Sequence, residues 1–349
     1  MYYVGVDVHQ RRSSVEILDQ NGALYKRFQV FGRWPELIQR IDTEAPRPFA
    51  VCYEASCGYG YLHEQFSRMA HRVAVAHPGQ LRLIYRSKKK HDRIDAAKIA
   101  KILYLDTVPE VHVPSMDIRE WRALVEFRQR LVARHIAVKN QLQALLRGLA
   151  IVPVKGLWHR KGLQWLKELS LRDLDAVRRD LLLEELDQQH QKIQRLNRAL
   201  AQIAARHPGI TLLRTIPGVG VRTAEAVLAY VDDIRRFRRV GQVASYFGLI
   251  PCQDASAAKN RLGHITKDGP ATARKLLVEA SWMAVRRSPT IRQLFDRFVQ
   301  EKPGRRKIAI VAVAHHLIRV MTAMLRTGEV WRESPLMTTG RHGTPIRPT

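Results

Sequence analysis

The chain is poor in cysteine, in long apolar runs and in acidic residues, and each shortage excludes a class of protein. Only 3 of the 349 residues are cysteine (Cys52, Cys57 and Cys252), and none forms a Cys-x-x-Cys pair. A disulfide framework or a structural zinc site is therefore not expected. The N-terminus lacks a basic segment followed by an apolar stretch, and no apolar run reaches the length that spans a bilayer. We expect a reduced, soluble, cytoplasmic protein without a membrane partner.

The shortage of acidic residues points to the kind of partner. The chain has 32 Asp and Glu against 59 Lys and Arg, which gives a formal net charge of +27. Cationic side chains that neutralise phosphates release counterions and so supply affinity that does not depend on sequence. Nucleic acid is the favoured partner, and ribosomal-type or membrane-surface binding is the alternative. The length and the 46% of hydrophobic residues allow two or three modules with cores of their own.

The first hundred residues alternate between strand and helix patterns. The pair Asn21-Gly22 is a strong hairpin signal between two of the expected strands. In chain order we predict strands over Tyr2–His9, Ser14–Leu18 and Leu24–Val30, a helix over Trp34–Ile41, a strand over Phe49–Glu54, a helix over Tyr59–Ala70 and a strand over His71–His77. This is the element order of an α/β, ribonuclease H-like (RuvC-like) fold.

Beyond residue 115 the pattern becomes helical. Apolar residues at three/four spacing predict a long helix over Ser115–Leu149, and heptad-like spacing predicts another from about Leu171 to Ala205. The second helix fits either a coiled-coil arm or an amphipathic helix on the core of its own domain. We therefore expect an α/β module with a trailing long helix (1–150), a helical arm (151–206), a mostly helical module (207–330) and a disordered tail (331–349).

Four carboxylates suggest metal-assisted chemistry on phosphodiesters. Asp7 lies in the first expected strand, Glu54 ends another, and Asp92 and Asp95 share one face at the start of a helix. Hard cations such as Mg²⁺ or Mn²⁺ take oxygen ligands, and two ions about 3.5–4 Å apart assist phosphodiester cleavage. In a ribonuclease H-like fold such ligands come from the first strand, a neighbouring strand and a helix beside them. Ordinary strand-end carboxylates that face water are the alternative for Asp7 and Glu54.

A dense positive run adjoins the last two carboxylates. Lys88, Lys89, Lys90 and Arg93 are expected to neutralise the nucleic-acid backbone that is cut. A solvated loop is the alternative for the three lysines.

A second candidate for phosphate binding is the segment Ile216-Pro217-Gly218-Val219-Gly220. It is typical of a helix-hairpin-helix, in which bare glycine amides let a phosphate approach the N-terminus of the next helix. Such hairpins bind the nucleic-acid backbone without reading its sequence. We expect Gly218 and Gly220 to do so here, and a plain helix–helix turn is the alternative.

A serine lies among cations further along the chain. Ser256 is flanked by small residues and followed by Lys259, Arg261 and Lys267. A hydroxyl in such surroundings is a candidate nucleophile for a phosphodiester, with the cations as nucleic-acid contacts. Most serines in such loops are structural, which is the alternative.

In this order the motifs resemble those of a DEDD transposase of the Piv/MooV type, the insertion-sequence 110 family. The resemblance covers about residues 1–330. The matching stretches are Gly5-Val6-Asp7-Val8-His9, Glu54, Asp92-Arg93-Ile94-Asp95, Ile216-Pro217-Gly218-Val219-Gly220 and residues 248–269. The resemblance implies a RuvC-like N-terminal domain, a helical arm and a C-terminal transposase domain.

The resemblance also implies residue roles. The four DEDD carboxylates correspond to Asp7, Glu54, Asp92 and Asp95, and the nucleophilic serine corresponds to Ser256. The family carries a Ser-Ser-Gly-Gly-Lys-like stretch where this chain has Ala255-Ser256-Ala257-Ala258-Lys259, so only the second serine is present and both glycines are alanines.

The implied reaction is site-specific cutting and rejoining of donor and target DNA through a covalent phosphoserine, with Mg²⁺ on the carboxylates. The family implies dimers that pair into tetramers, an active site that two subunits can share, and, for some members, a structured guide RNA. Three alternatives remain: a Piv-like DNA invertase, a RuvC-like junction nuclease that uses water, and a non-enzymatic nucleic-acid-binding scaffold.

Overall fold

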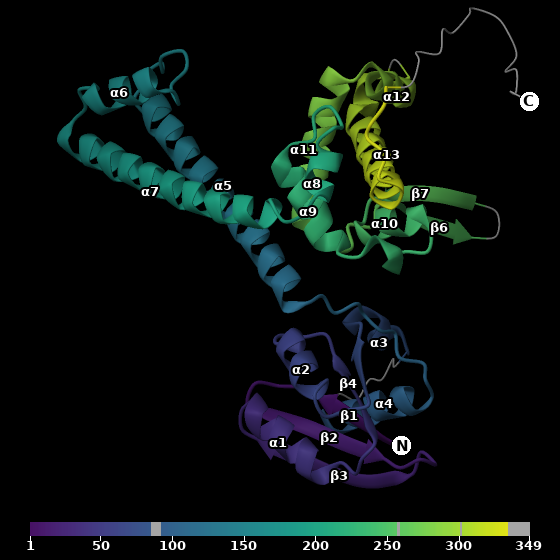
Figure 1. Ribbon diagram of the computed structural model, residues 1–349. Helices are drawn as coiled ribbons and strands as arrows, with labels where there is room; N and C mark the ends of the chain where they lie inside the picture. The colour runs from purple at the N-terminus through teal and green to yellow at the C-terminus, as the bar shows by residue number, and fades with distance from the viewer. Residues whose placement is uncertain (85–91, 257–258, 301, 334–349) are drawn as a thin grey trace, which may run out of the picture. The chain divides into compact units, whose positions relative to one another are not determined.

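The structure is a computed structural model that describes residues 1–84, 92–256, 259–300 and 302–333. Within these ranges, the side chains of residues 83–84, 92–94, 254–256 and 259–262 are also left out. The chain divides into two compact units, Met1–Met116 and a second unit that begins at Asp117 (Figure 1).

The first unit is built on a five-stranded sheet with the order β3-β2-β1-β4-β5. The first three strands pair antiparallel, whereas β1, β4 and β5 run parallel. The strands are β1 (Tyr2–Asp7), β2 (Arg12–Leu18), β3 (Leu24–Phe31), β4 (Phe49–Glu54) and β5 (Arg72–Ala76). The helices are α1 (Trp34–Glu44), α2 (Tyr59–Phe66), α3 (Pro78–Ile84) and α4 (Asp92–Tyr104). Every element predicted for residues 2–77 is present, with ends shifted by a few residues.

Helices cover both faces of this sheet, and the strand alternation decides which residues each helix meets. Val4 and Val6 point to one face, where they pack with buried residues of α1 and α2. Gly5 points to the other face, where a Cβ atom would lie 2.2 Å from the Ala100 nitrogen and 2.4 Å from the Ala96 oxygen. A glycine in a strand often marks such a close backbone approach, and here it lets α4 lie directly on β1.

The second unit begins with a helical arm. Figure 1 shows α5 (Met116–Gly148) and α7 (Asp173–Ala204) at an angle to each other, with α6 (Arg160–Glu168) near the ends through which they are connected. Both long helices predicted from the apolar spacing are present. Their shared core is aliphatic and consists of Val138, Leu142, Leu146, Leu157, Leu166, Leu182 and Leu186.

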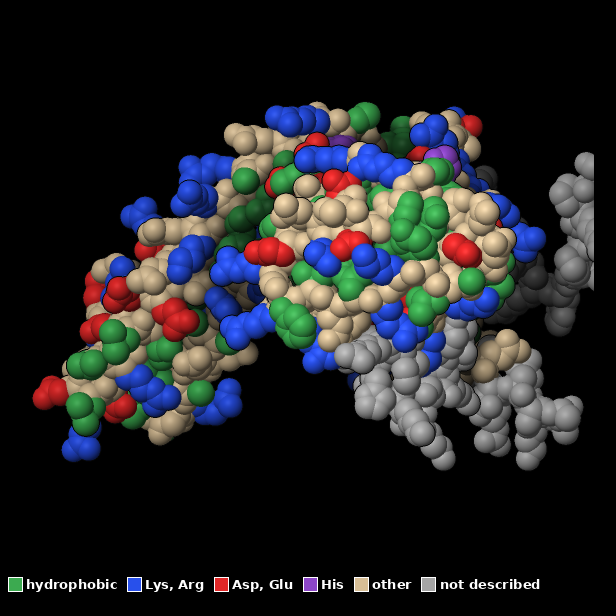
Figure 2. Space-filling model, turned by 90° about the horizontal axis from the view of Figure 1, so that it is seen from below, with side chains coloured by type: hydrophobic (Ala, Val, Ile, Leu, Met, Phe, Trp, Pro, Cys, Tyr) green, Lys and Arg blue, Asp and Glu red, His purple; other side chains and the backbone are tan. Residues whose placement is uncertain are grey.

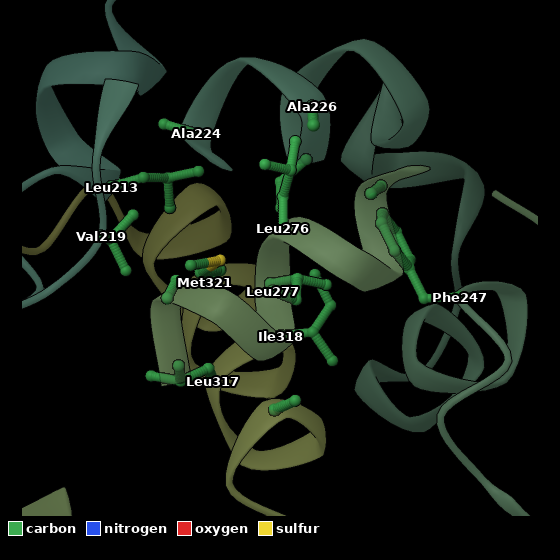
Figure 3. Close-up of a cluster of buried hydrophobic side chains, with 14 of the residues drawn as sticks. Leu213, Val219, Ala224, Ala226, Phe247, Leu276, Leu277, Leu317, Ile318 and Met321 are labelled. Carbon is green, nitrogen blue, oxygen red and sulfur yellow. The ribbon is translucent and has the colours of Figure 1, made fainter. Parts of the chain in front are cut away.

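The rest of the second unit is a mostly helical body. Its elements are α8 (Gly209–Leu213), α9 (Val221–Val231), α10 (Val240–Tyr246), β6 (Pro251–Ser256), β7 (Lys259–Ile265), α11 (Ala271–Arg287), α12 (Pro289–Val299) and α13 (Arg306–Thr327). Figure 3 shows the centre of its core, where Leu277 of α11 lies near Ile318 and Met321 of α13. The hairpin of β6 and β7 was not predicted, because its polar sequence lacks the alternating apolar pattern of a half-buried strand.

One helix in the described residues, Pro303–Thr327, is long and apolar enough to cross a membrane by length and composition alone. This corrects the expectation that no apolar run reaches such a length. Half of its most apolar stretch is buried inside the structure. Leu317, Ile318 and Met321 within it are fully buried in the core of the body, which accounts for an apolar surface on most sides of a helix.

Candidate active site

The strand register brings Asp7 and Glu54 together. Asp7 ends β1, Glu54 ends β4, and the two residues lie one step beyond the paired residues Val6 and Tyr53. Opposite residues of neighbouring strands point to the same face, and the strands lie about 4.8 Å apart. Asp7 is two residues from Gly5, so both carboxylates lie on the face that α4 covers.

Helix α4 runs antiparallel to β1. Near its C-terminal end, the Tyr104 ring packs edge-on against Tyr3, with 5.3 Å between ring centroids. Ala96 and Ala100, earlier in the helix, lie over Gly5. The helix therefore begins near the end of β1 that carries Asp7.

This direction places the other two predicted carboxylates at the same end of the sheet. Asp92 is the first residue of α4, one helical turn before Ala96. The side chain of Asp92 lies outside the described residues. Asp95 contacts Lys98, with 3.3 Å between Oδ1 and Nζ, and its side chain is 44% exposed. The structure thus collects the backbone positions of all four predicted carboxylates at one end of the sheet.

Asp7 is held in a polar environment. Its Oδ2 lies 3.3 Å from His9 Nε2, and its side chain is 16% exposed. The His9 backbone is in turn fixed by Ser13, whose hydroxyl oxygen accepts from the His9 N–H at 3.2 Å. His9 is therefore a neighbour of the carboxylates rather than a distant surface residue.

Two further polar residues continue the line of Asp7 and Glu54 across the sheet. Ser14 on β2 lies opposite Asp7, and Gln29 on β3 lies opposite Ser14. The Gln29 Nε2 donates to Ser14 Oγ at 3.2 Å, and Ser14 is only 3% exposed. We call these four residues, Gln29, Ser14, Asp7 and Glu54, the carboxylate row.

The next row toward the middle of the sheet carries a fifth carboxylate. Glu16 on β2 lies opposite Gly5 and faces α4, and it is 5% exposed. Arg27 on β3 donates from Nε to Glu16 Oε2 at 2.6 Å. Cys52 lies in the same row, and burial raises the pKa of its thiol to about 12. In this row the charge of Glu16 is thus paired with Arg27, and the Cys52 thiol is buried.

Sequence reasoning did not single out Ser14, Glu16 or Gln29. The available signal was the alternation of Ser14 and Glu16 with the apolar residues Val15 and Ile17, which predicts two polar side chains on one face of a buried strand. Their partners on β3 become visible only from the register.

The donor chemistry of the carboxylate row fits a divalent cation. Carboxylate oxygens are the ligands that Mg²⁺ and Mn²⁺ prefer, and Asp7 and Glu54 offer them from adjacent strand ends on one face. Among the described side chains, no three Asp, Glu, His or Cys residues gather closely enough to hold a metal ion. Asp7 and Glu54 therefore fit part of a metal site. The backbone positions of Asp92 and Asp95 lie near this pair in the fold.

The predicted serine lies at the tip of the β-hairpin in the second unit. Ser256 is the last residue of β6 and pairs with Lys259, the first residue of β7. The side chains of Ser256, Lys259 and Arg261 lie outside the described residues, as do those of Arg93 and the whole of Lys88, Lys89 and Lys90. Lys267 follows the hairpin, and its carbonyl oxygen accepts from Arg274 Nη2 at 2.9 Å.

The glycine turn before α9 has a packing function that the sequence did not reveal. Gly218 has a φ of +91°, and a Cβ atom there would lie 2.4 Å from the Ala284 nitrogen on α11. Gly220 precedes α9, and a Cβ atom there would meet nothing within 4 Å. Gly218 is thus required for the approach of α11, whereas the space beside Gly220 is open.

Arg222, two residues after this glycine turn, is bonded inside the protein. Arg222 Nη1 donates to both Glu225 oxygens at 2.8 and 2.6 Å, and its Nη2 donates to the Asn197 carbonyl at 3.4 Å. Arg128 of α5 donates to the Asn197 side chain at 2.7 Å. Glu225 is fully buried, and this burial raises its pKa to about 6 against the opposing effect of Arg222. These residues join the arm to the helical body.

A cavity of about 730 Å³ lies within the arm. Both cations and carboxylates line it, among them Lys139, Lys167, Asp180, Glu184 and Asp187. Lys139 Nζ lies 5.1 Å from the centre of the Trp158 ring. This mixed lining does not select one class of ligand, and it belongs to a different unit from the carboxylate row.

Comparison with known proteins matches two parts of the chain to transposase families. A transposase family model for IS110-type DEDD enzymes matches residues 4–151, which include Asp7, Glu54, Asp92 and Asp95. A second family model, described as the transposase IS116/IS110/IS902 family, matches residues 210–296, which include Ser256.

Individual relatives are similar over most of their length. The chain is 27% identical to the transposase for insertion sequence element IS1111A of Coxiella burnetii, over 94% of this chain and 91% of the relative. It is 25% identical to the transposase for insertion sequence element IS1328 of Yersinia enterocolitica, over 94% of this chain and 98% of the relative. It is 28% identical to a probable family 20 transposase of Pseudomonas aeruginosa, over 82% and 86%. The chain therefore belongs to the IS110-family DEDD transposases, enzymes that act on DNA.

Proposed function

We propose that this transposase cuts and rejoins DNA through a covalent phosphoserine, with Ser256 as nucleophile and Asp7, Glu54, Asp92 and Asp95 as ligands of Mg²⁺. The single observation that carries the proposal is the register of β1 and β4, which sets Asp7 and Glu54 side by side on the face beneath the start of α4. DEDD transposases are generally metal-dependent, and the four acids are the hard oxygen donors that such a metal requires.

The serine would carry the DNA strand between cutting and joining. Its Oγ forms a bond to the scissile phosphorus and gives up its proton, while the bond from phosphorus to the deoxyribose oxygen breaks and that oxygen leaves as a hydroxyl. A hydroxyl of the receiving strand then attacks the same phosphorus and releases Ser256. A bound divalent cation would favour ionisation of the attacking hydroxyl and offset the charge on the phosphate.

The topology supports a ribonuclease H-like assignment for the first unit. The order β3-β2-β1-β4-β5, with three antiparallel strands and two parallel ones, follows the expected arrangement, and α4 supplies acids next to the central strand. We assign α8, the glycine turn and α9 to a helix-hairpin-helix in which Gly220 and the start of α9 take a phosphate.

Further partners follow from charge and family. Lys and Arg are spread over the face shown in Figure 2, in keeping with the net charge of +27. We propose donor and target DNA as substrates, assembly as a dimer or tetramer, an active site shared between subunits, and a guide RNA encoded by the element. Action on chromosomal DNA would take place in the cytoplasm.

The test is the capture of a protein–DNA adduct. Wild-type protein, Mg²⁺ and labelled DNA that spans an end of its own element should give an adduct that survives denaturation. Ser256→Ala should abolish the adduct while DNA binding stays within about twofold, because one hydroxyl adds little to a phosphate-dominated interface. Ser245→Ala, which removes an exposed serine of α10, is the matched control and should behave like wild type.

The outcomes separate the competing reactions. Cleavage that persists unchanged in Ser256→Ala would favour a nuclease that uses water. An adduct whose rejoined products are inverted segments would favour an invertase. Binding without any cleavage under all metal conditions would leave only a scaffold and would overturn the proposal.

A further inference from the structure

A row of different chemistry follows the carboxylate row on the side away from Glu16 and Arg27. Phe31 ends β3, and Arg12, which begins β2, lies opposite it in the register. Phe31 is two residues beyond Gln29 and Arg12 is two residues before Ser14, so both lie on the same face as the carboxylates. Phe31 is 73% exposed.

A single exposed aromatic residue is ordinary on a protein surface, but the position of Phe31 is informative. Strand spacings of about 4.8 Å and a rise of about 3.3 Å per residue place its Cα roughly 12 Å from that of Asp7. That is about four nucleotide steps at the duplex rise of roughly 3.4 Å per strand, and fewer for an extended strand.

Three arginines lie near Phe31 in the fold. Arg12 shares its row, Arg11 precedes Arg12, and Arg33 lies two residues after Phe31, and all three are exposed. Glu36 lies at the same end of β3, where its Oε2 accepts from the Arg33 N–H at 3.0 Å. The backbone fixes this arrangement, since the Gly32 N–H donates to the Arg11 carbonyl at 3.0 Å and so ties the end of β3 to the turn before β2. The ring thus lies at a tied strand end, beside three arginines and one carboxylate.

We propose that Phe31 and Arg12 hold an unpaired segment of the DNA strand next to the scissile phosphate, with a base stacked on Phe31 and a phosphate on Arg12. An aromatic ring next to arginines is the combination that binds single-stranded nucleic acid, because every base offers a flat face and every linkage a charge. A duplex hides its base faces within its own stack, so this surface distinguishes an opened strand from an intact one. The inference rests on the proposed function, since it locates the strand relative to the carboxylate row.

The experiment compares single-stranded and duplex oligonucleotides of the same mixed sequence by fluorescence anisotropy, with the full-length protein in EDTA. Phe31→Ala should weaken single-strand binding about tenfold, the usual effect of removing one stacking ring, and should change duplex binding less than twofold. Phe31→Trp should retain wild-type binding. Leu24→Ala is the matched control, because it removes an exposed apolar side chain (54% exposed) from the other end of the same strand.

Salt dependence distinguishes the two contacts. Arg12→Ala should reduce the slope of log affinity against log salt by about one, as expected for one lost phosphate contact. Phe31→Ala should leave that slope unchanged, because stacking releases no counterion.

A crosslink locates the base directly. Irradiation with a single strand that carries 5-iododeoxyuridine should attach it to the tryptic peptide Phe28–Arg33, with the adduct at Phe31. Equal loss of single-strand and duplex binding in Phe31→Ala, wild-type binding by that variant, or a crosslink elsewhere only would each overturn the inference. These assays need neither metal nor cleavage, so the surface can stand if the phosphoserine proposal fails, and the converse also holds.

Discussion

The two units place their predicted functional residues in different ways. In the first unit, strand register alone brings Asp7 and Glu54 to one end of one face, and α4 starts above that end. In the second unit, Gly218 of the glycine turn is packed against α11, and Arg222, which follows the turn, is bonded to Glu225. A motif residue therefore indicates function only after its packing partners are known.

The same contrast exists within the first unit. The carboxylate row holds Asp7 beside the neutral pair Ser14 and Gln29, whereas the next row neutralises Glu16 with Arg27. We therefore expect two acids on one face of neighbouring strands to have different tasks. Paired substitutions distinguish residues that act in DNA cleavage or binding from residues that stabilise the fold.

The largest difference in cleavage rate is expected between the variants Asp7→Asn and Glu16→Gln. Loss of a metal-binding carboxylate should lower strand cleavage roughly 10²–10⁴-fold, a cost of several kcal/mol in transition-state stabilisation. Glu16→Gln should leave the cleavage rate within about threefold but lower the free energy of unfolding by about 2 kcal/mol, because Arg27 loses a charged acceptor. Single-turnover assays measure the cleavage rate, and urea unfolding measures the free energy of unfolding. Equal losses of cleavage in both variants would mean that the two rows are not functionally distinct.

The glycine turn gives the next comparison. Gly218→Ala should lower the free energy of unfolding by more than about 2 kcal/mol, because the new methyl group meets α11 backbone and the positive φ disfavours it. Gly220→Ala should cost less than about 1 kcal/mol, since it only replaces glycine at a helix N-cap. If Gly220 admits a phosphate, its variant should still weaken DNA binding. Unchanged DNA binding by Gly220→Ala would reduce the turn to a structural element.

The smallest effect concerns the junction between arm and body, and it depends on pH. Burial raises the pKa of Glu225 from 4.5 to about 6, so the folded state binds more protons than the unfolded state between these values. The contribution of Glu225 to stability is therefore full below pH 4.5 and is lost as the pH rises through 6, by about 2 kcal/mol in total. Urea unfolding of wild type and Glu225→Gln across pH 4.5–7 should show this loss as a difference between the two proteins. Parallel curves would contradict it.

Local patterns were sufficient to predict the elements over residues 2–77 and to place Asp7 in the first strand and Glu54 at the end of another. Phe49–Glu54 has the same bounds in the structure as in the sequence prediction, because a short apolar run with β-branched and aromatic residues favours a buried strand. The partners of those carboxylates could not be predicted. Ser14 and Gln29 meet only through the pairing of β2 with β3, which the sequence of either strand does not specify in detail.

In the second unit, periodicity predicted the long helices of the arm but not the environment of single residues. The sequence around Gly218 is compatible with a phosphate-binding turn and with a glycine needed for close packing. Only the proximity of Ala284 reveals the packing. The polar residues of β6 and β7 form a hairpin through backbone pairing, which leaves no apolar signature. The apolar surface of α13 fits a membrane helix by composition, and its place in the core shows why it is apolar.

The central claim is that the carboxylate row, and not the neighbouring acid on the same face, binds the divalent cation needed for cutting. Titration of Mn²⁺ into full-length wild type, Asp7→Asn and Glu16→Gln, followed by the electron paramagnetic resonance of free Mn²⁺, tests it without any DNA. The account predicts that Asp7→Asn weakens binding by at least about tenfold, because a charged oxygen ligand is lost, while Glu16→Gln binds like wild type. Wild-type Mn²⁺ binding by Asp7→Asn, or equal weakening in both variants, would contradict it.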